Sequence, residues 1–396
     1  MKQKRKSMVL LASFCIVAIF AIIFHLITGQ AKQKAQAATN QNVYTAFGDS
    51  IAAGYGLEGY SDDQTKAPKD SYQALVAAFL KTNSHNYAVT GDNSSDCIEI
   101  LTSGIADEYL EQSDIITLSI GSNDLLLPFI YRMIKEFDID PGSIDPTNPM
   151  PELNISSMSK YWQKLKQLLS DLSDDEELHT QAAAFPDKFQ TILSLLKEKA
   201  PNAKIYVTNI YNPFLSITAI PELGKTADIY IKEINKAFRT DAADYTLVDV
   251  YTPFKENPAY TNFHVDLSNP SSPDISMDPH PSVKGHKKIA KLFTEAIQHT
   301  YAPKAASISQ IKSSRTYKLT ANVKLPKNAD KYQLLYASSK NGTYKTLATA
   351  TRNTYRTNNK KLKSNRTYYI KARSLRKING VTYYGKDSKA YKLTIK

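Results

Sequence analysis

Cysteine is nearly absent from this 396-residue sequence, which holds two cysteines and a single tryptophan. Cys15 lies inside an apolar run, and Phe14 before it is too bulky for a lipoprotein signal, so lipidation is excluded. Only Cys97 remains beyond that run, so the chain has no intramolecular disulfide and must be stabilised by core packing. The seven histidines show no paired spacing typical of metal ligands. The sequence therefore predicts no metal and no cofactor.

Long apolar runs are also scarce, and the single one covers residues 8–28, directly after four positive charges in residues 2–6. This pattern is typical of an export signal, and the small residues at 35–37 suit cleavage by signal peptidase. A retained membrane anchor is the alternative, because 21 residues match the ~20 that span a bilayer. We expect an exported protein, either secreted or attached to the outer face of the membrane or cell wall, and the lack of disulfides points to a bacterium.

Acidic residues are almost missing from the C-terminal part of the chain. Residues 301–396 contain 23 Lys+Arg and two Asp+Glu. Residues 41–300 contain 21 Lys+Arg and 36 Asp+Glu. This contrast predicts three parts: a signal or anchor with its linker (1–40), an acidic domain (41–300) and a basic domain (305–396). The basic domain should attract anionic cell-wall polymers or lipid surfaces. Nucleic acid would also bind to such a positive surface, but it is not expected as the partner of an exported protein. The other alternative is that the basic residues only form a solvated face of the domain.

The acidic part contains short apolar runs that are rich in β-branched and aromatic residues. Helical patterns at 72–81 and 189–199 lie between them. This alternation predicts an α/β fold with a doubly wound parallel sheet, in which ligands bind beyond the carboxyl ends of the strands. The five predicted strands are 43–47, 87–90, 115–120, 204–210 and 246–250.

A long stretch, 125–188, separates the third and fourth predicted strands. It combines a segment rich in Pro, Asp and Asn (138–151), a predicted helix (158–172) and an acidic cluster (171–177). An insertion beside a strand end can serve as a lid, and a plain surface elaboration is the alternative.

The basic part changes to short strands with turn signals. Asn341-Gly342 and Asn379-Gly380 are typical of hairpin turns. Strands of this length and spacing predict an all-β sandwich, and the pattern resembles a bacterial fibronectin type III-like module. The predicted strands are 317–323, 331–337, 344–350, 367–375 and 381–384.

Glycines and polar residues follow the predicted strands of the acidic part and recur near its end. A serine that follows a buried strand, between glycines, lies where a helix starts and where its hydroxyl faces the cleft. Alone it would be interpreted as a helix cap, but the order of four such segments is specific. The segments are Gly48-Asp49-Ser50, Gly91, 119–124 (Ser-Ile-Gly-Ser-Asn-Asp) and 278–282 (Asp-Pro-His-Pro-Ser).

Over residues 41–296 the sequence resembles the SGNH/GDSL hydrolases, whose four blocks supply Ser, Gly, Asn and His in this order. The resemblance implies a three-layer, flavodoxin-like fold of about five strands and a serine ester hydrolase. It assigns Ser50 as the nucleophile and His280 as the general base. The amides of Ser50 and Gly91 and the side chain of Asn123 would form the oxyanion hole. Tyr211-Asn212-Pro213 also resembles a feature of the family.

These residue types suit the chemistry. A serine hydroxyl is a poor nucleophile until an imidazole within hydrogen-bond reach accepts its proton. The charge that then develops on the carbonyl oxygen needs N–H donors that are already in place. Gly91 lets the backbone approach without a Cβ, and Asn123 donates an N–H without a charge. We interpret Asp124 as a positioning residue.

The acid that orients the histidine departs from the family pattern. The family usually has an aspartate three residues before the histidine, where this sequence has Met277. Asp278 is the nearest acid, and it and His280 each precede a proline, which favours an extended backbone. Side chains two residues apart then project to one side, so we assign Asp278 as the third catalytic residue. Asp274 or a backbone carbonyl is the alternative.

His286 lies where a helix is expected to start, and we interpret it as a surface or capping residue. The sequence as a whole predicts hydrolysis of a carboxylic ester, with a lipid or short-chain acyl ester as substrate. Two alternatives stay open. One is an O-acetyl esterase of cell-wall carbohydrate, and the other is a wall-binding protein whose α/β domain is inactive.

Overall fold

The computed structural model describes residues 42–61, 67–137, 167–215, 221–239, 244–266, 274–276 and 278–396. Residues 42–396 form one compact unit. The predicted signal or anchor and the segment 138–151 lie outside the described residues, so both stay predictions. In the ranges given above, no helix is both long enough and apolar enough to cross a membrane.

Five parallel strands form the central sheet, in the order β2-β1-β3-β4-β5. This is the strand order of flavodoxin-like doubly wound sheets, and the predicted α/β class is confirmed. The strands are β1 (Tyr44–Gly48), β2 (Ser84–Asn86), β3 (Ile115–Ser119), β4 (Lys204–Thr208) and β5 (Thr246–Val248).

The second strand was predicted a few residues too late, at 87–90. The strand itself ends at Asn86, but its continuation keeps bonding to β1: the amides of Tyr87 and Val89 donate to the carbonyls of Ala46 and Gly48 at 2.8 and 3.1 Å. The chain therefore still runs along β1 up to the glycine-containing turn, and the apolar residues mark this extension rather than the strand.

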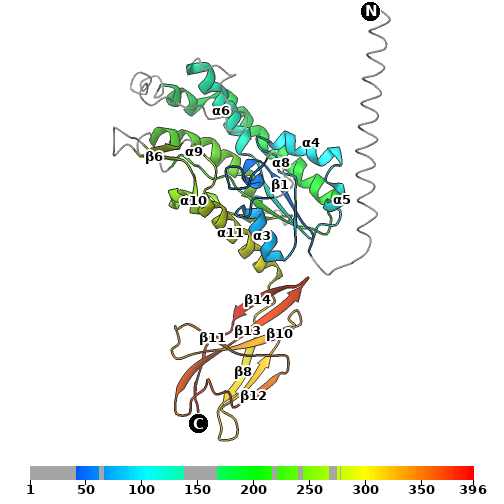
Figure 1. Ribbon diagram of the computed structural model, residues 1–396, viewed down its shortest axis with the longest axis vertical. Coiled ribbons are helices and arrows are strands. Elements are labelled where there is room, and N and C mark those ends of the chain that lie inside the picture. The colour runs from blue at the N-terminus through cyan, green and yellow to red at the C-terminus, as the bar shows by residue number, and fades with distance from the viewer. Residues whose placement is uncertain are drawn as a thin grey trace, which may run out of the picture. The chain divides into compact units, whose positions relative to one another are not determined.

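Helices cover both faces of the sheet, which confirms the three-layer architecture (Figure 1). Alternate residues of one strand point to opposite cores: Phe47 joins a core with α4, α8 and α9, whereas Tyr44 and Ala46 join a core with α3 and α11. The helices are α2 (Ser50–Ala53), α3 (Tyr72–Leu80), α4 (Ser94–Ser103), α5 (Asp107–Leu110), α6 (Ser122–Phe137), α8 (Glu176–Lys199), α9 (Pro221–Asn235), α10 (Tyr251–Glu256) and α11 (Val283–Tyr301). Short 3₁₀ turns occupy Leu172–Asp174, Ala237–Arg239 and Pro258–Tyr260, and a small antiparallel pair joins β6 (His264–Asp266) and β7 (Asp274–Ser276).

Helix α8 is much longer than the predicted 189–199. It begins after Asp175, whose side chain accepts the amide of Leu178 at 3.0 Å, and it runs through Pro186. A proline within a helical pattern usually predicts that the helix ends there, so the part of α8 around and before Pro186 was not predicted from the sequence. The acidic cluster at 171–177 therefore leads into α8, and its last members, Asp175, Glu176 and Glu177, form the cap and first turn, where negative side chains are favourable.

The C-terminal part forms two antiparallel sheets around a core of its own. Asn379 and Gly380 have positive φ (45° and 81°) between β13 and β14, as the predicted hairpin turn requires. The sequence missed β8, β12 and β15, and the fibronectin type III-like identity stays a prediction. One sheet has the order β11-β10-β13-β14 with β15 also paired to β13, and the other β12-β9-β8. The strands are β8 (Ser307–Lys312), β9 (Leu319–Lys324), β10 (Lys331–Ala337), β11 (Lys345–Ala350), β12 (Thr354–Thr357), β13 (Thr367–Ile378), β14 (Val381–Asp387) and β15 (Tyr391–Thr394).

The β13–β14 hairpin packs against the α/β part of the chain. Val381 and Tyr383 belong to the core that contains α3 and α11, and the ring of Tyr383 lies 5.1 Å from that of Tyr301. The side-chain amide of Asn379 donates to Asn42 Oδ1 at 3.2 Å. These contacts explain why residues 42–396 form one unit, and the predicted division into domains near residue 300 stays a prediction.

His286 is fully buried between α3 and α11, so its interpretation as a surface residue is wrong. Its Nδ1 accepts the amide of Tyr72 at 3.3 Å, the first residue of α3. Burial, followed by the charge of His280, lowers the pKa of His286 to about 3. Gly285 before it allows α11 to approach the 3₁₀ turn Pro258–Tyr260, because a Cβ there would lie 2.0 Å from the carbonyl oxygen of Tyr260.

We expect His286 to make folding stability strongly dependent on pH below neutrality. Its unfolded pKa is about 6.5, so as pH falls from there toward 3 the unfolded state binds a proton that the folded state excludes. Stability should then fall by up to about 1.4 kcal/mol per pH unit. Urea unfolding between pH 7 and 4 checks this. His286→Gln should flatten the slope, and the exposed-site control His299→Gln should not; parallel curves for the wild type and His286→Gln would disprove the idea.

Candidate active site

Ser50 is the first residue of the short helix α2, directly after the tight turn that follows β1. Asp49 caps that helix, and its Oδ1 accepts the amide of Ile51 at 2.9 Å. The turn packs closely on β3, because a Cβ on Gly48 would lie 2.2 Å from the carbonyl oxygen of Ser119. This packing places the Ser50 side chain at the carboxyl end of the sheet, with 7% of the residue exposed.

Asp49 is a buried acid directly behind Ser50. Burial raises its pKa to about 7, and the charges of Asp92 and Asp124 add to the effect. Its Oδ2 has no hydrogen-bond partner among the described residues. The hydrogen bond that Asp49 makes with its side chain is therefore to the backbone of the turn, and neither of its carboxylate oxygens is hydrogen-bonded to the hydroxyl of Ser50 among the described residues.

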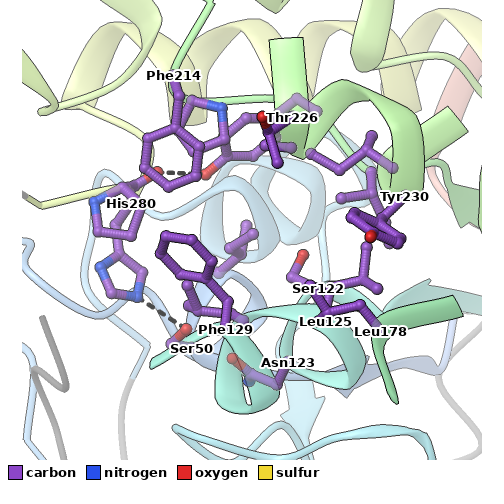
Figure 2. Close-up of a pocket in the computed structure, with 18 residues that line it drawn as sticks. Ser50, Ser122, Asn123, Leu125, Phe129, Leu178, Phe214, Thr226, Tyr230 and His280 are labelled. Atoms are coloured by element: carbon purple, nitrogen blue, oxygen red, sulfur yellow. Dashed lines mark hydrogen bonds between the residues drawn. The ribbon is translucent and has the colours of Figure 1, made fainter. Parts of the chain in front are cut away.

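His280 and Asp278 complete a hydrogen-bonded chain with Ser50. His280 Nε2 lies 2.8 Å from Ser50 Oγ (Figure 2). On the other side of the ring, Nδ1 lies 2.5 Å from Asp278 Oδ1. Ser50 and His280 are 230 positions apart in the sequence. The structure thus brings together Ser50, His280 and Asp278 in the order of a nucleophile, a base and an orienting acid.

The spacing of two residues between Asp278 and His280 is compatible with this contact. Asp278 Oδ1 accepts both the Nδ1–H of His280 and its backbone amide, the latter at 3.0 Å. Burial alone would raise the pKa of Asp278, but the bonds from His280 and Asn262 outweigh burial and hold that pKa below its usual value. Asp278 is therefore a carboxylate at neutral pH.

Asn262 is a site residue that sequence reasoning missed. Its Nδ2 donates to the second oxygen of Asp278 at 2.8 Å, and its backbone amide donates to the carbonyl of His280 at 2.9 Å. A neighbouring bridge joins Thr261 to Pro281. Asn262 thereby fixes both the carboxylate and the backbone of the histidine loop. No motif in the sequence marks it, because its partners lie 16 and 18 positions away.

Two tyrosines hold the histidine loop from other sides. The hydroxyl of Tyr211, the first residue of the Tyr-Asn-Pro segment noted in the sequence, donates to the carbonyl of Pro279 at 2.9 Å. The half-buried ring of Tyr55 lies 4.6 Å from the imidazole of His280. Tyr55 follows the nucleophile turn, and the sequence did not indicate its role.

Asn123 links the start of α6 to the turn that carries Gly91. Its side-chain Nδ2 donates to the carbonyl of Asp92 at 2.8 Å, which leaves the second N–H of the amide for another acceptor. Gly91 has φ of 92°, and an added Cβ would meet nothing within 4 Å. Glycine is therefore needed for the backbone conformation, and the space in front of it is open. Asn123 lies at the same end of the pocket as Ser50 (Figure 2).

Asp124 binds Ser94, which directly follows the turn that carries Gly91. Its carboxylate accepts the backbone amide of Ser94 at 2.9 Å and the hydroxyl of Ser94 at 2.5 Å. Ser94 is the first residue of α4, so these bonds join α4 to α6. Burial raises the pKa of Asp124 despite the bonds from Ser94 and the nearby Lys188. These contacts fit a positioning residue.

An apolar pocket opens beside Ser50, and the empty space that it encloses together with the solvent at its mouth amounts to about 820 Å³. Its walls come from α6, from the first turn of α8, from α9 and from the segment after β4 (Figure 2). Part of the inserted stretch 125–188 therefore forms the pocket. The residues that line it are Ser50, Ile51, Ser122, Asn123, Leu125, Leu126, Phe129, Leu178, Ile210, Tyr211, Pro213, Phe214, Thr226, Ala227, Tyr230, Ile231, Pro279 and His280.

The polar groups of the distant wall bond to the protein. The hydroxyl of Tyr230 donates to the carbonyl of Leu172 at 2.5 Å and accepts the amide of Asp175 at 3.0 Å. The hydroxyl of Thr226 donates to the carbonyl of Leu169 at 3.2 Å. Because these hydroxyls are already hydrogen-bonded to the backbone, this end of the pocket offers a ligand a mainly apolar surface.

Asp274 was the alternative acid, and Met277 occupies the position where the family usually has an aspartate. The side chain of Asp274 and the whole of Met277 lie outside the described residues. Among the residues that are described, no three His, Cys, Asp or Glu side chains gather to hold a metal ion. The absence of a metal and of a cofactor stays a prediction.

Three similarities to known proteins accompany this geometry. A protein of Bacillus subtilis (strain 168), the uncharacterized protein YpmR, is 22% identical over 287 residues, which cover 70% of this chain and 90% of that protein. An extracellular lipase from Streptomyces rimosus is 18% identical, with 64% of this chain and 99% of the lipase covered and a TM-score of 0.44. An acetyl xylan esterase from Geobacillus stearothermophilus is 16% identical, with 65% and 96% covered and a TM-score of 0.36.

Residues 46–288, more than half of the chain, match the model of one protein family. The matched stretch starts in β1 and ends in α11, so it contains Ser50, Gly91, Asn123 and His280. The chain belongs to the GDSL-like lipase/acylhydrolase family.

Proposed function

We propose that the protein hydrolyses carboxylic esters through an acyl-enzyme on Ser50. The observation that carries the proposal is the continuous set of hydrogen bonds from Ser50 Oγ through His280 to Asp278, at 2.8 and 2.5 Å. A base within this distance can remove the serine proton as the new bond forms.

In the first half of the reaction, Ser50 Oγ attacks the acyl carbon while its proton passes to His280 Nε2. The Asn123 side chain and the amides of Ser50 and Gly91 stabilise the charge on the former carbonyl oxygen. The intermediate then expels the alcohol, which takes the proton from His280. In the second half, water loses a proton to His280 as its oxygen attacks the acyl carbon. The bond from that carbon to Ser50 Oγ then breaks, Ser50 takes the proton back from His280, and the carboxylic acid is released. Asp278 holds the imidazole and stabilises its charged form.

The pocket favours an acyl chain over a small acetyl group. Its walls carry leucine, isoleucine and phenylalanine side chains, and its distant polar groups are already bonded to the backbone. Burying each CH₂ group contributes about 0.8 kcal/mol, so a longer chain gains binding energy in this pocket. We therefore propose lipid or other acyl esters as substrates.

Hydrolysis of p-nitrophenyl esters of increasing chain length tests this substrate class. We expect kcat/KM to be higher for the octanoate than for the acetate. Ala227→Phe, which fills part of the pocket, should lower kcat/KM for the octanoate by about 10-fold or more and affect the acetate little. The control Ile229→Phe lies on the same helix at an exposed position outside the pocket and should behave as wild type.

A contrary result would be equal loss for both esters in Ala227→Phe, or activity limited to acetyl esters. The second outcome would favour the O-acetyl esterase of wall carbohydrate. Release of acetate from acetylated polysaccharide would then identify that function directly.

We also propose that the enzyme works outside the cytoplasm, secreted or attached to the outer face of the membrane or wall. The charged N-terminus with its apolar run supports export. The net charge of +21 over residues 301–396 supports a second task for this region, attachment to an anionic polymer or surface.

A further inference from the structure

The strand register separates two faces of the sheet that contains β10 and β13. Tyr332, Leu334, Ile370 and Ala372 belong to the core between the two sheets. The alternate residues of β13 therefore point away from that core. Among them, Lys371 pairs with Leu335 of β10, and Arg373 pairs with Gln333.

Four cations lie on this outer face, together with two tyrosines. Lys331 of β10 lies opposite Leu375 of β13, and Lys392 of β15 lies opposite Tyr369 of β13. These two lysines therefore flank Lys371 and Arg373 along the strand. From Leu375 to Tyr369 the strand advances six residues, or about 20 Å. We call this set the β13 strip: Lys331, Tyr369, Lys371, Arg373, Tyr384 and Lys392.

The central cations of the strip are held in place. Lys371 Nζ lies 4.1 Å from the centre of the Tyr344 ring, and the guanidinium of Arg373 lies 5.7 Å from that of Tyr384. Asp387 also binds both cations, Arg373 Nε at 2.7 Å and Lys371 Nζ at 3.6 Å. Side chains ordered in advance lose less entropy when they bind a ligand.

The charge of the strip exceeds that of its single acid. Lys331 and Lys392 form no ion pair with any described residue, and Asp387 is one of only two acids among residues 301–396. The strip therefore carries an excess of positive charge over a length of several strand residues. A linear ligand with repeated negative charges complements it.

The apolar side chains of the same face are covered. Leu335, Ala337 and Leu375 are 3%, 5% and 8% exposed. These three aliphatic side chains are thus not free to enter a lipid layer, unlike those of membrane-binding surfaces. One face of each ring in Tyr344 and Tyr384 is taken by a cation, which also reduces the stacking surface that single-stranded nucleic acid uses.

We infer that the β13 strip binds a polyanion whose phosphodiester groups alternate with sugar or polyol units. The lysines and Arg373 bind the phosphodiesters, and Gln333 and the tyrosine hydroxyls offer hydrogen bonds to the hydroxyls of the units between them. The inference is independent of the chemistry at Ser50. It gives the basic part of the chain a defined binding face and a defined class of ligand.

Fluorescence anisotropy of labelled poly(glycerol phosphate) with the full-length chain tests the inference. The strip variant combines Lys331→Gln, Lys371→Gln and Lys392→Gln, and it keeps the Arg373–Asp387 pair. The control variant combines Lys312→Gln, Lys324→Gln and Arg356→Gln, which are exposed cations of the other sheet. Both variants lose the same charge, so any difference between them reports the location of the site.

We expect Kd to rise about 10-fold or more in the strip variant and less than about 3-fold in the control, with weaker binding as salt rises. The thermal unfolding midpoints of both variants should match that of the wild type. Equal losses in the two variants would overturn the inference, because binding would then follow total charge. Tighter binding to single-stranded DNA of equal charge, or to anionic lipid vesicles, would overturn it as well.

Discussion

Replacing Ser50 with alanine should lower kcat for ester hydrolysis by about 10⁶-fold, to the rate that binding and the oxyanion donors alone support. The reason is that His280 then has no hydroxyl to activate, although its ring and Asp278 stay in place. The fold should be unaffected, because Ser50 is the first residue of a short helix capped by Asp49. Steady-state hydrolysis of a p-nitrophenyl ester measures the loss.

Labelling by a fluorophosphonate gives a second measurement that needs no knowledge of the natural substrate. The wild type should be labelled and Ser50→Ala should not. Ser122→Ala is the matched control, since Ser122 lines the same pocket and, within the described part of the chain, it is Ser50 whose hydroxyl bonds to His280. Labelling that persists in Ser50→Ala would reject the proposed nucleophile, and a wild type that is never labelled would favour the inactive wall-binding protein.

The change Asp278→Asn should lower kcat by about 10⁴-fold, because an amide no longer selects the tautomer of His280 with its proton on Nδ1. It also cannot stabilise the charged imidazole that forms as Ser50 attacks. KM should change little, since Asp278 does not line the pocket. Activity near that of the wild type would remove Asp278 from the mechanism and direct attention to Asp274.

The change Asn262→Ala tests whether Asp278 must be held in its observed orientation, because it leaves the carboxylate in place and removes a hydrogen bond that orients it. It removes one hydrogen bond to a charged group, which contributes about 1.5–3 kcal/mol, so we expect a smaller loss of kcat, about 10-fold to 100-fold. The bond from Asn262 contributes to the lowered pKa of Asp278, so its removal should raise that pKa. Steady-state hydrolysis of a p-nitrophenyl ester measures the loss, and a loss as large as that of Asp278→Asn would contradict a role limited to orientation.

The prediction that Asp278 lies beside His280 rested on the prolines after each of them. Both prolines favour an extended backbone, in which side chains two residues apart project to the same side. The observed contact of 2.5 Å agrees with that local argument. The same kind of local information located β1, β3 and β4 within a residue or two, because buried parallel strands are continuous apolar runs.

Other features depended on parts of the chain that are distant in sequence. Asn262 is an ordinary loop residue until folding brings it to Asp278, and His286 appears polar and exposed until α3 covers it. The pocket combines α6, α8 and α9, whose apolar stripes do not reveal which of them face a cavity. The short strands β8, β12 and β15 carry few apolar residues, and their edges are stabilised by pairing that no local pattern records.

By itself the amino-acid sequence determined the fold class, the order of the strands along the chain, the family blocks and the charge contrast between the two parts. These properties follow from local periodicity, turn residues and composition, which act over a few neighbouring positions. Only the tertiary structure decided how the acid is held, which helices enclose the pocket and which face of the basic sheet carries ordered cations. Such contacts join residues tens to hundreds of positions apart, and packing and burial select them only once the chain has folded.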